Sequence, residues 1–260
     1  MKKSVVLIAC LIFLNVTGYA QADPIKENNS RSFKNITIKI SDDVSLIQIS
    51  DDAYIHVSFA EVEGYGRVGA NGLVLTDKGK AFLFDSPWNN EQTKILLTYL
   101  KDSLHLKVVG FIPNHWHKDC MGGLKYIQDQ HILSYANEQT REICKERGLP
   151  VPLFGFSDSL TLEFGNKTIR CYYMGAAHSM DNIVVWIPSE QILFPGCIVK
   201  SLNSRNLGNT ADGDLKAYPE TIGRLQKQFP EAKIVIPGHG QYGGKELIEH
   251  TLELANERME

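Results

Sequence analysis

Apolar and polar residues alternate along the first third of the chain, which is the pattern of half-buried β-strands. Isoleucine and valine fill many of the apolar positions, as is usual in strands. Among these runs, Ala60–Ala70 holds three glycines around Tyr65 and is predicted to be a mobile hairpin loop. The predicted strands are Ile36–Ile40, Val44–Ile49, Ala53–Phe59, Gly72–Thr76 and Ala81–Asp85.

After these strands, apolar residues recur at the three- and four-residue spacing of amphipathic helices, interrupted by short apolar runs. Strands followed by helices, twice over, predict an α/β fold in which two packed sheets carry helices on their outer sides. No linker-like stretch separates the halves, so residues 34–260 are predicted to form a single domain. The predicted helices are Asn90–Leu100, Gly122–Gln128, Glu138–Arg147, Pro219–Phe229 and Lys245–Ala255, and the further strands are Leu106–Ile112, Ser159–Phe164, Thr168–Met174, Asn182–Ile187, Gln191–Phe194 and Ile234–Ile236.

The first 20 residues have the three-part layout of a secretory signal peptide. A basic start is followed by the apolar run Ser4–Val16 and by small and polar residues up to Ala20. The run is shorter than the roughly 20 apolar residues that span a bilayer, and a buried N-terminal helix is the alternative. Leu7–Cys10 faintly resembles a lipoprotein box, but the apolar run continues past Cys10, which favours an ordinary signal peptide. Residues 21–33 are predicted to be a flexible leader, and the mature protein is expected in the periplasm of a Gram-negative bacterium.

The composition is that of an ordinary globular protein, with 43% hydrophobic and 22% charged residues. The formal net charge of −3 argues against a protein that binds nucleic acid through a basic surface. Beyond residue 20 the chain has four cysteines without the dense spacing of a disulfide scaffold. A thiol that stays free in an oxidising compartment needs a reason, and metal ligation is one.

The candidate chemistry begins directly after the predicted strand that ends at Ile112. His115, His117 and Asp119 are spaced by two residues, so on extended or turning chain their side chains can point to one side. In a helix the same spacing would turn successive side chains about 200° apart. Imidazole and carboxylate are ligand types that suit zinc.

Three further residues of metal-binding type follow other predicted strands. His178 lies between two strands, and Cys197 and His239 each follow a strand directly, next to glycine. Small residues at these turns let the backbone approach a metal closely. The chain has four other histidines, which lack such settings and are expected at the surface: His56, His105, His131 and His250.

This ordered set resembles the zinc-dependent β-lactamases of class B, in the subclass whose second metal site uses Asp, Cys and His. The resemblance runs from about Ile38 to Leu254, and Asn114–His117 with Asp119-Cys120 is similar to Bacteroides-type members. It rests on His115-x-His117-x-Asp119, Gly122-Gly123, His178 with Asp181–Trp186, Gly196-Cys197-x-x-Lys200, Leu207–Asn209 and Pro237–Gly240.

The resemblance implies a four-layer αβ/βα sandwich with two zinc ions per chain. One ion would be bound by His115, His117 and His178, and the other by Asp119, Cys197 and His239. The implied substrates are the β-lactam antibiotics (penicillins, cephalosporins and carbapenems), so the enzyme would be a hydrolase of a cyclic amide C–N bond. A monomer that binds neither nucleic acid nor, after signal cleavage, membrane is expected.

The implied mechanism fits elementary zinc chemistry. Three imidazoles and an open position form a catalytic site, and zinc lowers the pKa of its water to about 7, which yields hydroxide near neutrality. Two Zn²⁺ with Asp119, a Cys197 thiolate and hydroxide leave a net positive site that favours an anionic substrate. The hydroxide is expected to attack the amide carbonyl without an acyl-enzyme.

Further roles follow from the same resemblance. Lys200 would bind the substrate carboxylate, Asn209 would orient the β-lactam carbonyl or stabilise the oxyanion, and Asp119 would position water and help deliver a proton. Tyr65 would offer an apolar platform. The sequence departs from the family pattern at Tyr65, where relatives carry Trp, and at Pro195 and Ala176-Ala177, where glycine is common.

Two residues are candidates to orient the ligands from behind, Asp85 and Cys120, although a structural turn explains Asp85 equally well. The same fold also carries thioester hydrolases, lactonases, nucleases and sulfur dioxygenases. Those mostly have a histidine where Cys120 stands and an aspartate where Cys197 stands. A periplasmic zinc-binding protein without catalysis is a further alternative, but a storage site would close its coordination shell.

Overall fold

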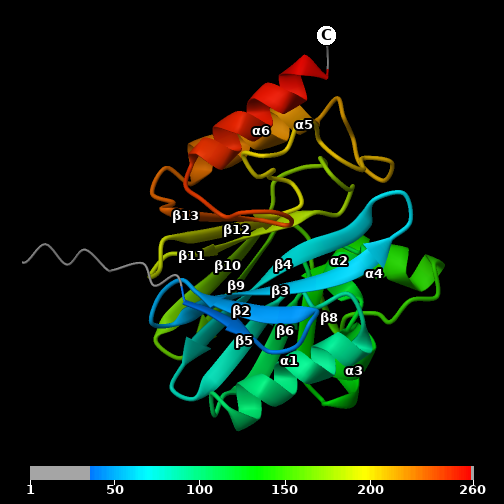
Figure 1. Cartoon of the computed structure of the whole chain (residues 1–260). Helices are drawn as coiled ribbons and strands as arrows, with labels where there is room; N and C mark the ends of the chain where they lie inside the picture. Colours follow the sequence, from blue (N-terminus) through cyan, green and yellow to red (C-terminus); the bar gives the residue numbers. More distant parts are fainter. Residues whose placement is uncertain (1–35, 259–260) are drawn as a thin grey trace, which may run out of the picture. The chain divides into compact units, whose positions relative to one another are not determined.

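The computed structural model describes residues 36–258, which belong to one compact unit (Figure 1). The predicted signal peptide (residues 1–20) and leader (21–33) lie outside the described residues. Within residues 36–258, no helix has the length and apolar character that crossing a membrane requires.

The first sheet has eight strands that lie side by side in sequence order. Neighbours are antiparallel from β1 to β5 and parallel from β5 to β8, so the sheet is mixed. Its strands are β1 (Ile36–Lys39), β2 (Val44–Gln48), β3 (Ala53–Val62), β4 (Gly66–Asp77), β5 (Lys80–Phe84), β6 (Lys107–Ile112), β7 (Leu133–Asn137) and β8 (Phe154–Phe156).

The second sheet has five strands in the order β13-β12-β11-β10-β9. Only its β12–β13 pair is parallel. Its strands are β9 (Ser159–Phe164), β10 (Lys167–Tyr173), β11 (Ile183–Ile187), β12 (Ile192–Gly196) and β13 (Ile234–Pro237).

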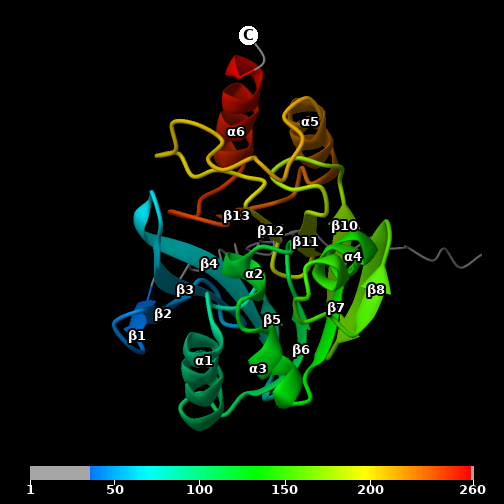
Figure 2. The same ribbon diagram turned by 90° about the vertical axis from the view of Figure 1, so that its right-hand side faces the viewer.

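Helices cover the outer side of each sheet (Figures 1 and 2). The larger sheet is covered by α1 (Asn90–Asp102), α2 (Lys118–Met121), α3 (Leu124–Asp129) and α4 (Glu138–Glu146), and the smaller sheet by α5 (Tyr218–Gln228) and α6 (Glu246–Glu257). The predicted four-layer αβ/βα sandwich is therefore confirmed.

The period-2 pattern of the strands explains why the layers pack. In β5, Phe82 and Phe84 join the core between the two sheets, while the intervening Leu83 faces the helices. In β13, Ile234 and Ile236 likewise face the other sheet and Val235 faces α5 and α6. Both faces of these strands are buried, which accounts for their continuous apolar runs.

The structure corrects the prediction of a mobile loop at Ala60–Ala70. The β3–β4 pairing continues as far as Val62 opposite Gly66, so only three residues form the turn. Gly64 and Gly66 have φ values of +79° and +72°, which glycine adopts without steric cost. The glycines thus shape a tight hairpin rather than a long loop. The sequence also missed β7, β8 and α2, which are short elements with little periodicity.

Candidate metal centre

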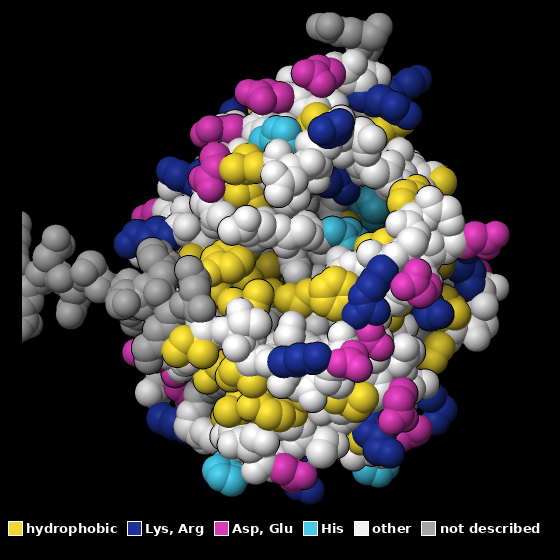
Figure 3. Space-filling model, viewed as in Figure 1, with side chains coloured by type: hydrophobic (Ala, Val, Ile, Leu, Met, Phe, Trp, Pro, Cys, Tyr) yellow, Lys and Arg dark blue, Asp and Glu magenta, His cyan; other side chains and the backbone are white. Residues whose placement is uncertain are grey.

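The six predicted ligands lie where strands of both sheets end. His115, His117 and Asp119 follow β6, His178 follows β10, Cys197 follows β12 and His239 follows β13. Figure 3 shows histidine side chains in a hollow on one face of the molecule.

The segment after β6 is extended only as far as His117, whose φ and ψ are −66° and 161°. Lys118 begins the single-turn helix α2, and Asp119 lies in its first turn. The expectation that all three side chains lie on extended or turning chain is therefore wrong for Asp119. The helical turn brings Asp119 to the centre by a different path.

Three imidazole nitrogens converge in a first triad. His117 Nδ1 lies 2.9 Å from His115 Nε2 and 3.3 Å from His178 Nε2. The three rings meet nearly edge to face, with interplanar angles of 75° to 89°. These three nitrogens therefore face one common point.

Asp119 is the centre of a second triad. Its Oδ2 lies 3.1 Å from His239 Nε2 and 3.3 Å from Cys197 Sγ. His115, Asp119 and Cys197 also bring one ligand atom each to within 4.8 Å of one another, so the two triads adjoin. A Cβ at Gly238 would lie 2.3 Å from Cys197 Sγ, which explains the glycine before His239.

Burial keeps two imidazoles of the first triad, His115 and His178, neutral. It lowers the pKa of His115 to about 3 and holds the pKa of His178 well below its usual value. An imidazole without a proton on the facing nitrogen has a lone pair to offer a metal.

The surroundings of the second triad favour the charged forms of its three side chains. A hydrogen bond from Cys120 lowers the pKa of the Cys197 thiol to about 6. Burial alone would raise the pKa of Asp119, but the hydrogen bond from His239 and the charge of that imidazole hold it well below the usual value. Burial likewise opposes the charged form of His239, yet the Cys197 thiolate and Asp119 raise its pKa well above the ordinary value.

Both candidate orienting residues lie beneath the first triad. Cys120 Sγ is 3.3 Å from His115 Nδ1, on the side of the ring away from the triad. The Asp85 carboxylate accepts a hydrogen bond from the backbone N–H of Asn114, next to His115.

His56, expected at the surface, is buried and its Nε2 lies 3.0 Å from the Asp85 carbonyl oxygen. That prediction was wrong because β3 turns His56 toward the interior, opposite Gly72.

The other histidines follow the prediction more closely. His105 and His131 are exposed, and His250 is half-buried with its Nε2 2.9 Å from the Ser204 carbonyl oxygen.

The predicted substrate residues differ in how deeply they are buried. Lys200 Nζ donates to the Cys197 carbonyl oxygen at 2.7 Å, and desolvation lowers the pKa of its ammonium group. Asn209 is exposed in the loop between β12 and α5, where its Oδ1 accepts from the Ala211 N–H. Tyr65 lies at the tip of the β3–β4 hairpin with 67% of its surface exposed.

The sequence missed three polar residues that hold the ligand-bearing segments. Asn71 donates to two carbonyl oxygens on either side of His239. Asp181 accepts from the Trp116 N–H and from the Thr140 hydroxyl. Asp212 contacts His117 Nε2 at 2.9 Å. Only Asp181 had a signal, because it stands three residues after His178.

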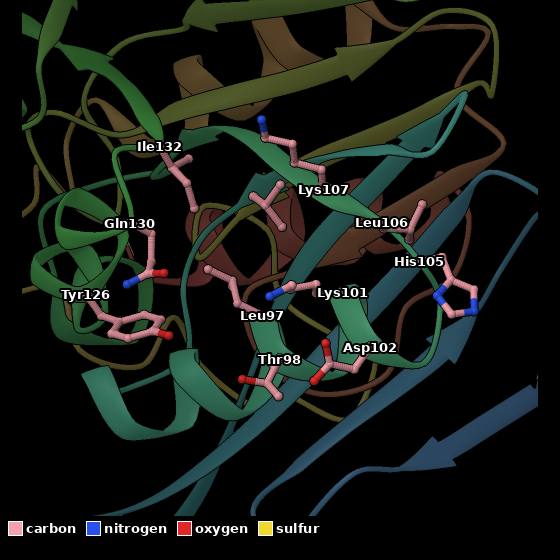
Figure 4. Close-up of a pocket in the computed structure, with 11 residues that line it drawn as sticks. Leu97, Thr98, Lys101, Asp102, His105, Leu106, Lys107, Tyr126, Gln130 and Ile132 are labelled. Carbon is pink, nitrogen blue, oxygen red and sulfur yellow. The ribbon is translucent and has the colours of Figure 1, made fainter.

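Two cavities in the described part of the chain lie apart from the six candidate ligands. One, of about 620 Å³, lies between α1, β6 and α3 and is lined by Lys101, Lys107 and Tyr126 among others (Figure 4). The other, of about 500 Å³, reaches Gly69 and Gly240 beside His239. Neither cavity is lined by a residue of either triad.

No family model matches the chain. Among curated proteins, it is 50% identical over 224 residues to a metallo-β-lactamase type 2 from Bacteroides fragilis, which covers 86% of this chain and 90% of that protein. It is 33% identical over 248 residues to a protein of the same name from Bacillus cereus, covering 95% and 94%.

Solved structures give the same result. A metallo-β-lactamase from Pontibacter korlensis matches with a TM-score of 0.79 and 38% identity, over 82% of this chain and 99% of that one. TMB-1, a protein studied for substrate and inhibitor binding, matches with a TM-score of 0.80 and 36% identity, over 84% and 99%.

Proposed function

The chain belongs to the metallo-β-lactamase family, and from this premise we propose that it opens the amide ring of penicillins, cephalosporins and carbapenems with two zinc ions. As a member of the family it is a metal-dependent hydrolase of β-lactam amides, an activity that confers antibiotic resistance. The observation that carries the finer proposal is the pair of triads, one of three imidazole nitrogens and one in which Asp119 Oδ2 contacts both Cys197 and His239.

The donor atoms fit zinc. Ligands about 2.1 Å from a tetrahedral zinc ion lie about 3.4 Å from one another. The neighbouring donor atoms are 2.9 and 3.3 Å apart in the first triad and 3.1 and 3.3 Å apart in the second. In this proposal one ion is held by His115, His117 and His178, and the second by Asp119, Cys197 and His239.

When bound, zinc acts as a Lewis acid and lowers the pKa of a water molecule to about 7. The chain supplies the orientation. The Asp119 carboxylate lies at the junction of the triads and keeps a low pKa, so it is an acceptor that can hold and turn a water molecule. During the attack this carboxylate would take up the proton that the water molecule loses, and after the C–N bond breaks it would pass that proton to the departing nitrogen. No acyl-enzyme is part of this mechanism.

The residues around the triads would hold the substrate. Lys200 keeps its ammonium group beside Cys197, where it can pair with the carboxylate that β-lactams carry. The Oδ1 of Asn209 is engaged with Ala211, so its amide N–H is the group that would donate to the lactam carbonyl oxygen. Tyr65, at the hairpin tip, would pack on the apolar side of the drug.

Hydrolysis with and without metal tests the activity. The purified protein is offered a penicillin, a cephalosporin and a carbapenem, with zinc, with a chelator, and after zinc is restored. We expect ring opening of all three, loss with chelator and recovery with zinc. A carbapenem left intact would overturn the carbapenem part, and no chelator-sensitive opening of any drug would overturn the lactamase proposal.

Metal content tests the two-ion part separately. We expect about two zinc ions per chain in the dialysed protein, measured by elemental analysis, and loss of one in Cys197→Ala. A single ion that is insensitive to Cys197→Ala would contradict the second site.

We also propose that the mature protein is a periplasmic monomer. The support for the periplasmic location is the signal-like layout of residues 1–20. Cell fractionation and size-exclusion chromatography test these points, and a protein retained in the cytoplasm would overturn the first.

A further inference from the structure

Asp212 touches a predicted metal ligand from behind. It lies in the loop between β12 and α5, and its Oδ2 is 2.9 Å from His117 Nε2. The opposite ring nitrogen, Nδ1, faces His115 and His178. The His117 side chain is 15% exposed and that of Asp212 32%, so the contact is only partly open to water.

This contact decides which nitrogen carries the proton. A histidine that offers Nδ1 to a metal must keep its hydrogen on Nε2. A carboxylate that accepts this hydrogen fixes the tautomer, limits ring rotation and makes the facing nitrogen a better ligand. Asp212 is placed to do all three for His117.

Arg147 holds the other oxygen of Asp212. Its Nη2 lies 3.6 Å from Asp212 Oδ1, and its guanidinium carbon lies 4.0 Å above the ring of Trp116. The Trp116 ring in turn meets the His117 ring at 4.5 Å and 71°. Four consecutive contacts thus form a closed ring of side chains, Trp116, Arg147, Asp212 and His117.

The ring joins segments that are distant in sequence. Trp116 and His117 follow β6, Arg147 ends α4, and Asp212 belongs to the loop that also carries Asn209. The Trp116 N–H is fixed separately by Asp181 Oδ2 at 2.9 Å. The loop is therefore tied to His117 through the Asp212 carboxylate, and to the His178 turn through backbone hydrogen bonds of Asp212 with Met180 and of Asp214 with Ala177.

We propose that Asp212, held by Arg147, is a positioning residue that sets the tautomer and angle of His117 and thereby the zinc affinity of the first triad. The inference rests on the proposed assignment of His117 to zinc. It goes beyond that assignment because Asp212 and Arg147 are not themselves ligands in it.

Zinc affinity of Asp212 variants is the test. Competition with a chromophoric chelator is measured for wild type, Asp212→Ala and Asp212→Asn. We expect Asp212→Ala to bind the first zinc roughly 10–100-fold more weakly, as for other partners of metal-ligating histidines. Asp212→Asn keeps a carbonyl oxygen for His117 Nε2–H and should retain most of the affinity. If Asp212→Ala does not fold, Asp212→Ser, whose side chain is too short to reach Nε2, replaces it.

Asp214→Ala is the matched control. Asp214 lies two residues along the same loop, but its Oδ1 accepts from the N–H groups of Lys216 and Ala217 at the start of α5. We expect it to lower thermal stability without changing zinc affinity. Equal affinity of Asp212→Ala and wild type, or an equal loss in Asp214→Ala, would overturn the inference.

Cobalt substitution separates the two triads. A thiolate-to-cobalt charge-transfer band reports Cys197 in the second triad, whereas the ligand-field bands also report the all-nitrogen first triad. In Asp212→Ala we expect the charge-transfer band to persist while cobalt in the first triad is lost or weakened. Loss of the charge-transfer band alone would contradict the inference.

A double-variant cycle tests Arg147. Arg147→Ala should weaken the first zinc about two- to fivefold, as expected for a half-exposed ion pair, and should have no effect when Asp212 is already alanine. Additive losses would show that Arg147 does not act through Asp212. A wild-type protein that binds no zinc would overturn the proposed function itself, whereas wild-type binding with unaffected variants overturns only this inference.

Discussion

Asp119 is the residue on which the charges of the centre converge. Its Oδ2 contacts both the Cys197 thiol and the His239 imidazole, and His115 lies close by. Burial keeps His115 and His178 of the first triad neutral, whereas the second triad offers an anionic oxygen and a thiol whose pKa is about 6. The two triads therefore differ in chemistry, and single substitutions should affect them separately.

Replacement of Cys197 by serine should empty the second triad selectively. Serine has nearly the same shape as cysteine, but its neutral hydroxyl is a much poorer ligand for zinc than a thiolate. We expect a loss of second-zinc affinity larger than the roughly 10–100-fold caused by loss of an outer hydrogen-bond partner. Metal content and chelator competition measure the loss. Cys144→Ala is the control, since Cys144 is a buried thiol on the inner face of α4. Full two-zinc occupancy in Cys197→Ser would contradict the assignment.

His56 should make the metal-free protein sensitive to acid. Burial lowers its pKa in the folded state to about 4, against 6.5 in the unfolded chain. The unfolded chain therefore binds more protons between these values, so stability is present above pH 6.5 and is lost as the pH falls toward 4. The contribution is about 3 kcal/mol at most.

Urea unfolding of the metal-free protein at pH 7 and pH 4.5 measures this effect. His56→Gln keeps an N–H donor for the Asp85 carbonyl oxygen but cannot titrate. The variant should lose less stability than wild type on acidification. His115, with a pKa of about 3, supplies a background slope in both proteins. Identical losses in the two proteins would refute the role of His56.

At the residue scale, the six candidate ligands could be found in the sequence because each is a metal-binding residue type that follows a predicted strand. All six candidate ligands meet in space because strand ends of both sheets face one side of the molecule, and that follows from alternation and short turns. The orienting residues escaped prediction because their roles depend on contacts across the chain. Asp212 is 95 residues from His117, and nothing in its local sequence distinguishes it from Asp214.

At the scale of elements, the segment after β13 is held by β4. The Asn71 backbone N–H donates to the Gly238 carbonyl oxygen at 2.8 Å, and its side-chain amide donates to Pro237 and Gly240 at 2.9 and 2.8 Å. The Gly69 carbonyl oxygen lies 2.8 Å from His239 Nδ1. A strand of the larger sheet thus positions a ligand carried by the smaller one.

Asn71→Ala should therefore loosen His239. The substitution leaves two carbonyl oxygens without their donor, which should cost about 1–3 kcal/mol of unfolding free energy. The affinity for the second zinc should fall as well, because the segment that carries His239 loses its hydrogen bonds to the Asn71 side chain. Thermal unfolding and chelator competition measure the two effects.

Asn166→Ala is the control, since Asn166 makes an exposed hydrogen bond with Lys78 away from the centre. It should change neither quantity appreciably. An Asn71→Ala protein that loses stability but keeps full second-zinc affinity would restrict Asn71 to a structural role.

The predictability of elements depended on their periodicity. Long amphipathic segments such as α1 and buried runs such as β6 and β13 were located within a few residues, because one face or both faces must be apolar. The short strands β7 and β8 gave no such signal and are stabilised by parallel pairing within the larger sheet. The glycines of the β3–β4 hairpin suggested mobility, although in the structure they permit a tight turn.

At the scale of the whole molecule, the two sheets are fixed together at both ends of their strands. One end carries the metal ligands, which come from both sheets. At the other end, before β10 leads toward His178, Lys167 lies between two carboxylates. Its Nζ is 2.7 Å from Glu190 and 2.8 Å from Asp52, and the Lys167 and Glu190 side chains are 8% and 2% exposed. Asp52 belongs to a turn of the larger sheet, and Glu190 to a turn of the smaller one.

Removal of the Lys167 ammonium group should destabilise the packing of the sheets. Lys167→Ala would remove the ammonium group that lies 2.7 Å from the buried Glu190 carboxylate, and breaking a buried ion pair typically costs about 3–5 kcal/mol. Urea unfolding of the metal-free protein measures the loss. Lys78→Ala is the control, because Lys78 also bridges the sheets through Asn166 but is exposed, so its removal should change stability by about 0.5 kcal/mol or less.

A paired replacement separates charge from packing. Lys167→Met combined with Glu190→Leu removes both buried charges and keeps their volume, so it should restore most of the stability lost in Lys167→Ala. Lys167, Glu190 and Asp52, here called the clamp, lie at the opposite end of β10 from the triads. Zinc affinity should therefore be unchanged in all of these variants that remain folded. Equal stability of Lys167→Ala and Lys78→Ala would show that the clamp does not hold the sheets. A fall in zinc affinity in the folded double variant would show instead that the two ends of the sandwich are coupled.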